Sequence, residues 1–91
     1  MSGSSVVVSG GASGLGAAVV RRFRGLGHEV VFIDPNEEGG GEVSAETGAT
    51  QVVGDVTRED EVIRAIEAAE RLAPLRVAVC CAGVGWASRV V

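Results

Sequence analysis

The sequence has 91 residues, enough for one small domain over residues 1–91 and too few for two. Its net charge of −4 and lack of any lysine argue against nucleic acid as a partner, because phosphate binding needs a basic surface. No apolar run reaches the ~20 residues of a membrane span and no signal peptide is visible, so no membrane partner is expected.

The first part of the chain predicts a strand, a helix and a second strand. Residues 5–9 are rich in β-branched side chains between turn residues, which predicts a buried strand. From residue 15 the apolar residues recur at helical spacing, and the expected buried face carries Leu15, Val19, Phe23 and Leu26. Gly27 ends this helix, and residues 29–33 predict the second strand.

The middle of the chain is harder to assign. Residues 37–48 contain glutamates that favour a helix, but three consecutive glycines each disfavour it by about 1 kcal/mol relative to alanine. We therefore expect a weak or late-starting helix that Gly48 closes. Residues 50–54 predict the third strand.

The last part predicts a well-formed helix and a fourth strand. Thr57 and Asp60 are spaced like a capping pair at the start of the helix. The apolar residues expected to share its buried face are Val62, Ile63, Ile66, Ala69 and Ala73. Pro74 ends the helix, and residues 75–81 predict the fourth strand.

Apolar strands that alternate with helices predict an α/β fold, a Rossmann-type parallel sheet with helices on both faces. Right-handed crossovers and short loops favour the strand order 3-2-1-4. Ligands of such sheets lie beyond the carboxyl ends of the strands, where the strand order reverses. We therefore expect a crevice between residues 9–16 and residues 81–85.

The candidate site starts with the glycine-rich turn after the first strand. Gly10 permits the tight turn, while Gly14, Leu15 and Gly16 bring backbone N–H groups at the helix N-terminus towards a pyrophosphate. Ser13 adds a hydroxyl donor, and the helix dipole adds partial positive charge. The alternative is an ordinary bend without a ligand.

Other glycine-rich phosphate sites fit the sequence less well. A Walker loop requires a lysine, which the chain lacks, and the G-x-G-x-x-G fingerprint has Val19 at its third glycine. Methyltransferases usually carry a carboxylate just before such glycines, and residues 5–9 contain none.

Two aspartates at strand ends indicate a dinucleotide. Asp34 follows Gly16 by eighteen residues and is expected to accept hydrogen bonds from the adenosine ribose, which favours NAD over NADP. Asp55 ends the third strand and is expected to accept from the adenine amino group, with the Val56 backbone at the ring edge. For each aspartate the alternative is a solvated residue at a strand end.

These motifs resemble those of the classical short-chain dehydrogenase/reductase family. Residues 9–16, SGGASGLG, resemble its T-G-x-x-x-G-x-G signature, and Asp34 and Asp55-Val56 match its NAD-selecting acid and adenine-contacting pair. Residues 80–83, CCAG, resemble its N-N-A-G segment, with cysteines at both asparagine positions, among them Cys80 where the family usually has an asparagine. The resemblance implies that the cofactor contacts further residues at the end of the fourth strand, namely Cys81, Ala82 and Gly83.

The resemblance also implies an activity. Within the family, the chain looks most like the branch of 3-hydroxyacyl-CoA dehydrogenase type II and hydroxysteroid dehydrogenases, which interconvert a secondary alcohol and a ketone. The family uses a tyrosine as general acid/base and a lysine that lowers its pKa, and this sequence contains neither. We therefore expect the amino-terminal, NAD-binding part of such an oxidoreductase, inactive by itself. The alternatives are a stand-alone dinucleotide-binding module and an inert truncated fragment.

The remaining residues bear on location and association. Cys80 and Cys81 are adjacent and form no disulfide framework, so a reducing, cytoplasmic setting is expected. With His28 they give no recognisable metal-ligand spacing, so no metal is expected. A chain that ends soon after residues 75–81 leaves an open strand edge, for which we expect self-association.

Overall fold

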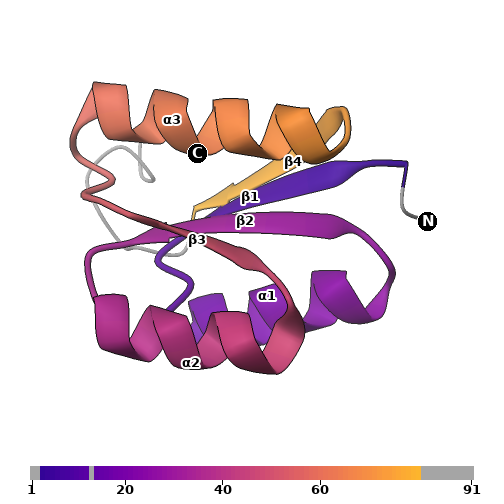
Figure 1. The fold of residues 1–91 in the computed structure, drawn as a ribbon, viewed down its shortest axis with the longest axis horizontal. Helices are drawn as coiled ribbons and strands as arrows, with labels where there is room; N and C mark the ends of the chain where they lie inside the picture. Colours follow the sequence, from indigo (N-terminus) through magenta and orange to yellow (C-terminus); the bar gives the residue numbers. More distant parts are fainter. Residues whose placement is uncertain (1–2, 13, 81–91) are drawn as a thin grey trace.

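The computed structural model describes residues 3–12 and 14–80. In chain order its elements are β1 (Ser5–Ser9), α1 (Gly14–Gly25), β2 (Glu29–Asp34), α2 (Glu37–Thr47), β3 (Thr50–Val53), α3 (Glu59–Leu72) and β4 (Leu75–Cys80). The strands pair in parallel in the order β3-β2-β1-β4. Helices α1 and α2 cover one face of the sheet and α3 covers the other (Figure 1). The predicted fold class and strand order are confirmed.

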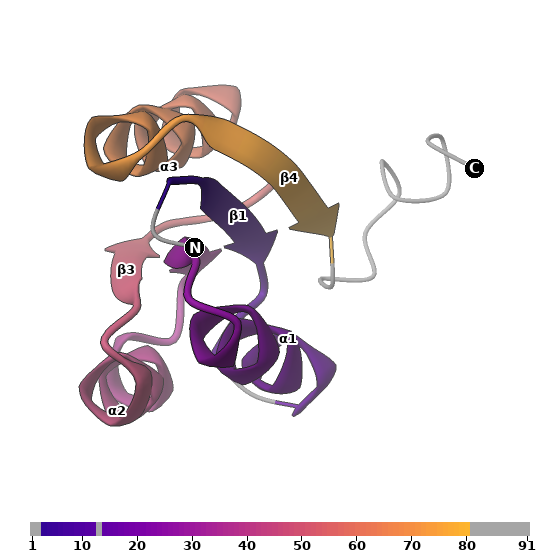
Figure 2. The ribbon, with the colours of Figure 1, turned by 90° about the vertical axis from the view of Figure 1, so that its right-hand side faces the viewer.

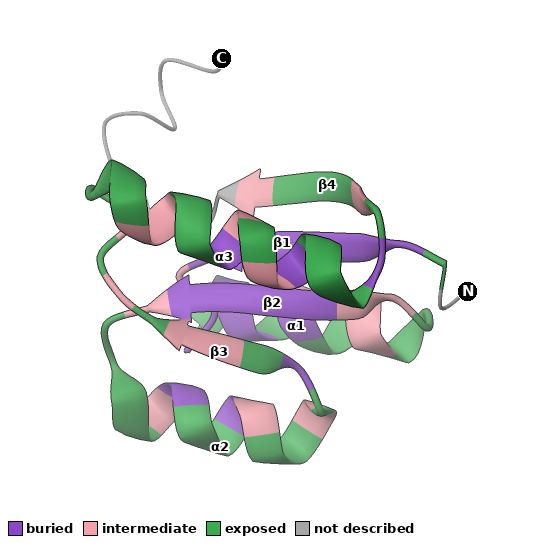
Figure 3. Cartoon of the chain, turned by 45° about the horizontal axis from the view of Figure 1, so that its top comes forward, coloured by how far each residue is buried: buried purple, intermediate pink, exposed green. Residues whose placement is uncertain are grey.

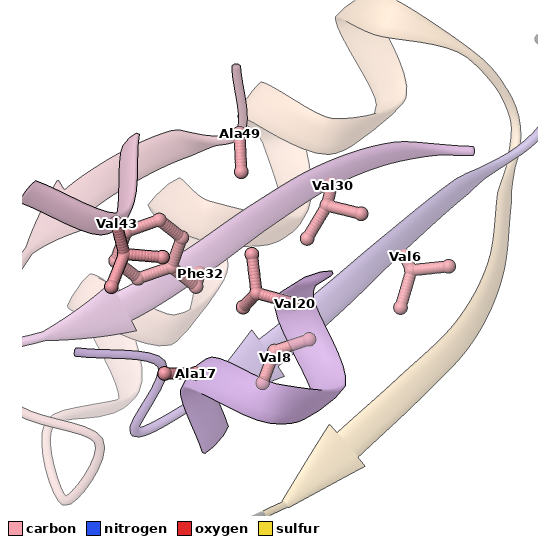
Figure 4. Packing of buried hydrophobic residues seen from close by; sticks show 8 residues of the cluster. All are labelled: Val6, Val8, Ala17, Val20, Val30, Phe32, Val43 and Ala49. Carbon is pink, nitrogen blue, oxygen red and sulfur yellow. The ribbon is translucent and has the colours of Figure 1, made fainter. Parts of the chain in front are cut away.

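The core forms two layers because successive side chains of a strand point to opposite faces of the sheet. Towards α1 and α2, the sheet and the helices together bury Val6, Val8, Ala17, Val20, Val30, Phe32, Val43 and Ala49 (Figure 4). Towards α3, the buried cluster consists of Val7, Val31, Ile33, Ala65 and Ala69. Both faces of β1 and β2 are covered, which explains why these strands are almost continuously apolar (Figure 3).

Helix α1 packs with a different face from the predicted one. Its buried residues are Gly16, Ala17 and Val20, whereas Leu15 and Leu26 are 71% and 50% exposed. Of the predicted face, only Val19 and Phe23 pack against the core, and both are partly buried. Small residues face the sheet because the glycine-rich turn brings the start of α1 close to the backbone of the chain before it, where larger side chains do not fit.

Helix α3 shows the same preference for small side chains. Ala65 and Ala69 are buried, Val62 and Ile66 are partly buried, and Ile63, which was predicted for the buried face, is 46% exposed. Alanines at the centre of the contact let the helix approach the sheet closely, so the larger residues lie at the sides of the contact. The predicted buried face is therefore confirmed at Val62, Ile66, Ala69 and Ala73 and is wrong at Ile63.

Two predicted helix starts also need correction. Helix α2 is regular from Glu37 to Thr47, neither weak nor late, because the Asn36 side chain accepts a hydrogen bond from Gly39 N at 3.0 Å. Gly48 closes α2 in the left-handed conformation, as predicted (φ 80°). Helix α3 follows Arg58, which makes no side-chain cap, so the predicted capping pair of Thr57 and Asp60 does not form.

The two outer strands differ from the centre of the sheet. Figure 2 shows β3 and β4 at opposite edges. Strand β4 pairs with β1, and Val77 on β4 is 40% exposed. In the described part of the chain no other strand pairs with β4. No helix within residues 3–12 and 14–80 has the length and apolar character needed to cross a bilayer.

Candidate functional site

The turn between β1 and α1 is held by close backbone contacts. Gly10 has a positive φ of 77°, and its N–H donates to the Ile33 carbonyl at 2.7 Å. A Cβ on Gly16 would lie 1.7 Å from the Gly10 carbonyl oxygen, and one on Gly11 would lie 2.6 Å from Phe32 Cβ. Gly16 is therefore required for packing of the helix against the turn, a reason that the sequence pattern did not reveal.

Gly14 differs from the other glycines of this turn. It begins α1 with a positive φ of 59°, is exposed, and has no atom within 4 Å of the position that a Cβ would take. Its neighbour Leu15 is also exposed. The first two residues of α1 are thus exposed, and the first turn of the helix contains no acidic residue.

Asp34 links the glycine turn to the start of α2. The carboxylate is at the end of β2, where Oδ2 accepts from Ala12 N at 3.2 Å and Oδ1 accepts from Asn36 N at 2.9 Å. An ionised carboxylate offers about four acceptor positions, so two remain for other donors. The aspartate is therefore fixed in orientation and still able to accept hydrogen bonds from a ligand.

Gln51 supports this aspartate and was missed by the sequence analysis. Its Nε2 donates to the Asp34 carbonyl at 3.2 Å and to the Asn36 carbonyl at 3.1 Å, which ties the turn after β2 to β3. The side chain lies over Gly40 of α2, where a Cβ would come within 2.2 Å of Nε2. The available signal in the sequence was a polar amide side chain in a short strand, in the element that follows a helix with three consecutive glycines.

Asp55 folds back on the residue two positions later. Its Oδ1 accepts from Thr57 N at 2.9 Å and from Thr57 Oγ1 at 2.7 Å. These hydrogen bonds favour the charged form and hold the pKa of Asp55 below its ordinary value, with a smaller contribution from the Arg58 charge. Asp55 as a whole is exposed.

The segment after Asp55 borders a small depression. Val56 is partly buried, and together with Thr57, Glu59 and Val62 it lines an open pocket of about 230 Å³. The backbone of Asp55 is held by Glu61 of α3, whose Oε1 accepts from Asp55 N. Glu61 is a second residue that the sequence analysis missed, because its role depends on a contact between the helix and the loop before it.

The carboxyl edge of the sheet brings several predicted residues into one region. Gly10 and Ala12 meet the end of β2 through Ile33 and Asp34, and Gly54 N at the end of β3 donates to the Asp34 carbonyl at 3.3 Å. Asp55 and Val56 follow directly after this contact. The predicted contacts that lie outside the described residues are Ser13, Cys81, Ala82 and Gly83. Among residues 3–12 and 14–80 no group of acidic, histidine and cysteine side chains is arranged to hold a metal ion.

A comparison with protein families assigns the chain. The family model described as "short chain dehydrogenase" matches residues 4–90, nearly the whole sequence. The chain belongs to the short-chain dehydrogenase family. This agrees with the resemblance of the glycine turn and the two aspartates, and with the order of the strands.

Two curated relatives of this chain carry different names. The chain is 40% identical over 92 residues to 3-hydroxyacyl-CoA dehydrogenase type-2 of Homo sapiens, covering 96% of this chain and 34% of that protein. It is 48% identical over 62 residues to L-fucose dehydrogenase of Rattus norvegicus, covering 67% of this chain and 23% of that protein. The chain thus spans about a quarter to a third of the length of these relatives.

Solved structures share the fold. The 3-hydroxyacyl-CoA dehydrogenase type-2 from Mycobacterium avium is 48% identical with a TM-score of 0.85, covering 90% of this chain and 33% of that one. A 3-ketoacyl-(acyl-carrier-protein) reductase from Brucella melitensis, complexed with NADH, is 29% identical with a TM-score of 0.76, over 85% and 33% of the two chains. BdcA in complex with NADPH is 35% identical with a TM-score of 0.77, covering 93% of this chain and 34% of that one.

Proposed function

We propose that these residues form the NAD-binding part of an oxidoreductase that interconverts a secondary alcohol and a ketone. The observation that carries the proposal is the Asp34 carboxylate, which is anchored beside the glycine turn and retains free acceptor positions. A carboxylate there accepts from ribose hydroxyls and repels a 2′-phosphate. Because similar structures hold NADH in one case and NADPH in another, the preference for NAD rests on Asp34.

The described residues fit a dinucleotide at the carboxyl edge. The first turn of α1 has no acidic residue, whereas the first turn of α2 has two acidic residues and the first turn of α3 has three. The first turn of α1 therefore adds no negative charge of its own to the partial positive charge at the start of the helix, which favours an anion. Gly14 leaves the approach to these N–H groups open. We assign the pyrophosphate to Gly10, Ser13, Gly14, Leu15 and Gly16.

The same proposal assigns the two aspartates and the end of β4. Asp34 orients the adenosine ribose, and Asp55 with Val56 borders the adenine ring. Beyond Cys80, the residues proposed to contact the nicotinamide side of the cofactor are Cys81, Ala82 and Gly83. When bound, the nicotinamide supplies the hydride acceptor or donor, and the described residues bind and orient the cofactor.

Proton transfer to or from the alcohol needs a further group. The 91 residues contain no tyrosine and no lysine, so the acid/base pair that the family resemblance implies is not within them. We propose 3-hydroxyacyl-CoA compounds as the substrate class of the whole enzyme, supported by 40% identity over 96% of this chain to a relative of that name. The chain alone should give no turnover of 3-hydroxybutyryl-CoA with NAD.

The test of cofactor choice is titration of the chain with NAD and with NADP. We expect tighter binding of NAD, and about a tenfold loss of NAD affinity in Asp34→Ala, as for a lost hydrogen bond to a charged group. Glu46→Ala is the control, since Glu46 is exposed on α2 and pairs with Arg21 of α1. Equal or tighter NADP binding, or unchanged NAD affinity in Asp34→Ala, would contradict the role of Asp34.

A second candidate function is a stand-alone dinucleotide-binding module. The 91 residues contain no tyrosine and no lysine, so by themselves they could bind the cofactor but do not supply the acid/base pair of the family. The two candidates differ in whether a longer polypeptide carries the catalytic pair. Sequencing the transcript downstream of codon 91 and searching for tyrosine followed four residues later by lysine discriminates them.

We further propose that a second copy of the chain pairs with the outer edge of β4. The support is that β4 pairs only with β1 in the described residues and that Val77 is substantially exposed. An apolar strand edge favours pairing with another strand. Sedimentation should therefore give a dimer or larger species, and a stable monomer at micromolar concentration would exclude this contact.

A further inference from the structure

We propose that Glu61 is a positioning residue that sets the Asp55–Val56 segment for the adenine end of the dinucleotide. The inference rests on the proposed function and deepens it, since it names the residue that gives the adenine subsite its shape. Glu61 lies in the first turn of α3 and does not line the pocket beside Val56. It acts through the backbone of Asp55 rather than on the ligand.

The first observation is the reach of the Glu61 side chain. Its Oε1 accepts from Asp55 N, six residues earlier in the chain. In an ordinary capping box the third helical residue reaches only to the N–H of the residue before the helix, here Arg58. Glu61 instead spans the whole loop between β3 and α3. Its side chain is 21% exposed, against 72% for Asp60 beside it, so it lies against the loop.

The second observation is that Gly54 makes room for this side chain. A Cβ on Gly54 would lie 2.6 Å from Glu61 Oε1 and 3.2 Å from Glu61 Cβ. Gly54 N also donates to the Asp34 carbonyl at 3.3 Å. The end of β3 is therefore fixed on one side by the strand that carries Asp34 and on the other by Glu61.

The third observation is the ion pair between Glu61 and Arg58. Arg58 Nε lies 3.2 Å from Glu61 Oε2, which leaves Oε1 for Asp55 N. Arg58 N also donates to the Asp55 carbonyl at 3.0 Å, so residues 55–58 form a closed turn. Both ends of this turn thus depend on contacts with residues at or near the start of α3.

The consequence is confined to one end of the dinucleotide. Val56 and Thr57 lie within the turn that Glu61 holds, and both line the pocket of about 230 Å³. The described glycines of the turn between β1 and α1 have their own backbone contacts: Gly10 N donates to the Ile33 carbonyl, and Gly16 lies against the Gly10 carbonyl. Loss of Glu61 should therefore weaken contacts to adenine and leave contacts to the nicotinamide end unchanged.

The experiment compares two halves of the cofactor by NMR titration of the full chain. Glu61→Ala should weaken binding of adenosine monophosphate about tenfold, the effect of one lost hydrogen bond to a charged group. Binding of nicotinamide mononucleotide should change less than about twofold. Glu61→Gln keeps an oxygen that accepts from Asp55 N and should restore most of the affinity. Glu67→Ala, exposed on the same helix, is the matched control and should behave like the unaltered chain.

Amide hydrogen exchange separates the positioning role from the proposed function. Glu61→Ala should raise the exchange rate of the Asp55 amide about tenfold or more, and Glu61→Gln should reverse most of this change. If exchange responds in this way but the unaltered chain binds neither half of the cofactor, the proposed function fails and the role in the loop stands. If the Asp55 amide exchanges alike in all variants, or both nucleotides weaken equally, the positioning role is wrong. Should Glu61→Ala not fold, the comparison of Glu61→Met with Glu61→Gln decides, since methionine keeps the length of the side chain without an oxygen to accept from Asp55 N. Exchange of the Asp55 amide should then rise in Glu61→Met and stay near that of the unaltered chain in Glu61→Gln.

Discussion

The two turns at the carboxyl edge of the sheet are built in different ways. The turn between β1 and α1 is held by backbone packed against backbone, with Gly16 against the Gly10 carbonyl. The turn between β3 and α3 is held by side-chain oxygens, since Asp55 accepts from Thr57 and Glu61 accepts from Asp55 N. In the first turn the closest contacts are made by glycines, with one hydrogen bond from Ala12 N to the Asp34 carboxylate, whereas in the second turn carboxylates make the contacts at both ends.

The difference predicts different sensitivities. A backbone contact leaves no room for an added atom and does not depend on protonation, so the first turn should be sensitive to volume. A carboxylate side chain can move aside to make room for an added atom, but its strength as a hydrogen-bond acceptor depends on its charge. The second turn should therefore tolerate added volume, and its stability should depend on pH through Asp55. Substitutions at matched positions in the two turns test this contrast.

The largest effect is expected for Gly16→Ala. The added Cβ would lie 1.7 Å from a backbone oxygen that the rest of the turn holds in place, so we expect a loss of about 3 kcal/mol or more in the free energy of unfolding. The measurement is urea denaturation followed by circular dichroism. Gly41→Ala is the matched control in α2, where a Cβ meets nothing, and it should gain up to about 1 kcal/mol. Similar values for the two variants would show that the turn is not tightly packed.

Gly11→Ala should have the next largest effect. Its Cβ would lie 2.6 Å from Phe32 Cβ, and Phe32 is fully buried, so we expect a loss of about 1–3 kcal/mol from overpacking. The loss should be smaller in a Phe32→Ala background, because alanine lacks the Cγ and Cδ2 atoms that would lie 2.7 Å from the added Cβ and keeps only the Cβ. A double-mutant cycle measures this coupling. Additive losses would indicate that the ring does not restrict residue 11.

Gly54→Ala tests the other turn with the same type of substitution. The added Cβ would lie 2.6 Å from Glu61 Oε1, which can move aside at the end of a flexible side chain. We expect a loss of only about 1 kcal/mol, close to one hydrogen bond, and almost none in a Glu61→Ala background. A loss as large as that of Gly16→Ala, measured under the same conditions, would remove the distinction between the turns.

The smallest effect is a pH dependence at Asp55. Its pKa is lowered in the folded chain by hydrogen bonds from Thr57, so its contribution to stability is present above the ordinary pKa of an aspartate and is lost as the pH falls through the lowered value. Thr57→Val removes one of the two donors. The difference in urea midpoint between Thr57→Val and the unaltered chain should therefore shrink at acid pH. A difference that is constant with pH would mean that Thr57 acts by packing alone.

Much of the fold could be predicted because its signals are local. The β-branched run before Gly10 and the strand that ends at Asp34 gave the two central strands, and their alternation with helices gave the sheet order. The regular form of α2 could not be predicted from its glycines. Its start depends on the Asn36 cap, and Gly40 is needed for contact with Gln51 of another strand.

The candidate site was predicted in part for a similar reason. Asp34 and Asp55 follow strands, so their location at the carboxyl edge could be inferred from chain order alone. Their partners could not, because the hydrogen bonds of Asp34 to Ala12 and of Asp55 to Glu61 link separate segments or span a loop. Leu15 and Ile63 were expected in the core from their helical spacing, but both are exposed. The spacing of apolar residues does not show how much room lies between a helix and the sheet, and here smaller side chains occupy that space.

The sequence by itself determined the order of the elements, the parallel sheet and the two aspartates at its carboxyl edge. The elements follow from hydrophobic periodicity within short segments of the chain. The order of the strands follows from the right-handed crossovers that connect neighbouring elements. Only the tertiary structure decided which residues of α1 face the sheet and why Gly16 and Gly54 must be glycine. Gly16 is required because two backbones meet there, and Gly54 because a glutamate from the next helix occupies the space of a side chain. Such requirements arise from packing between segments, which periodicity along a single segment does not contain.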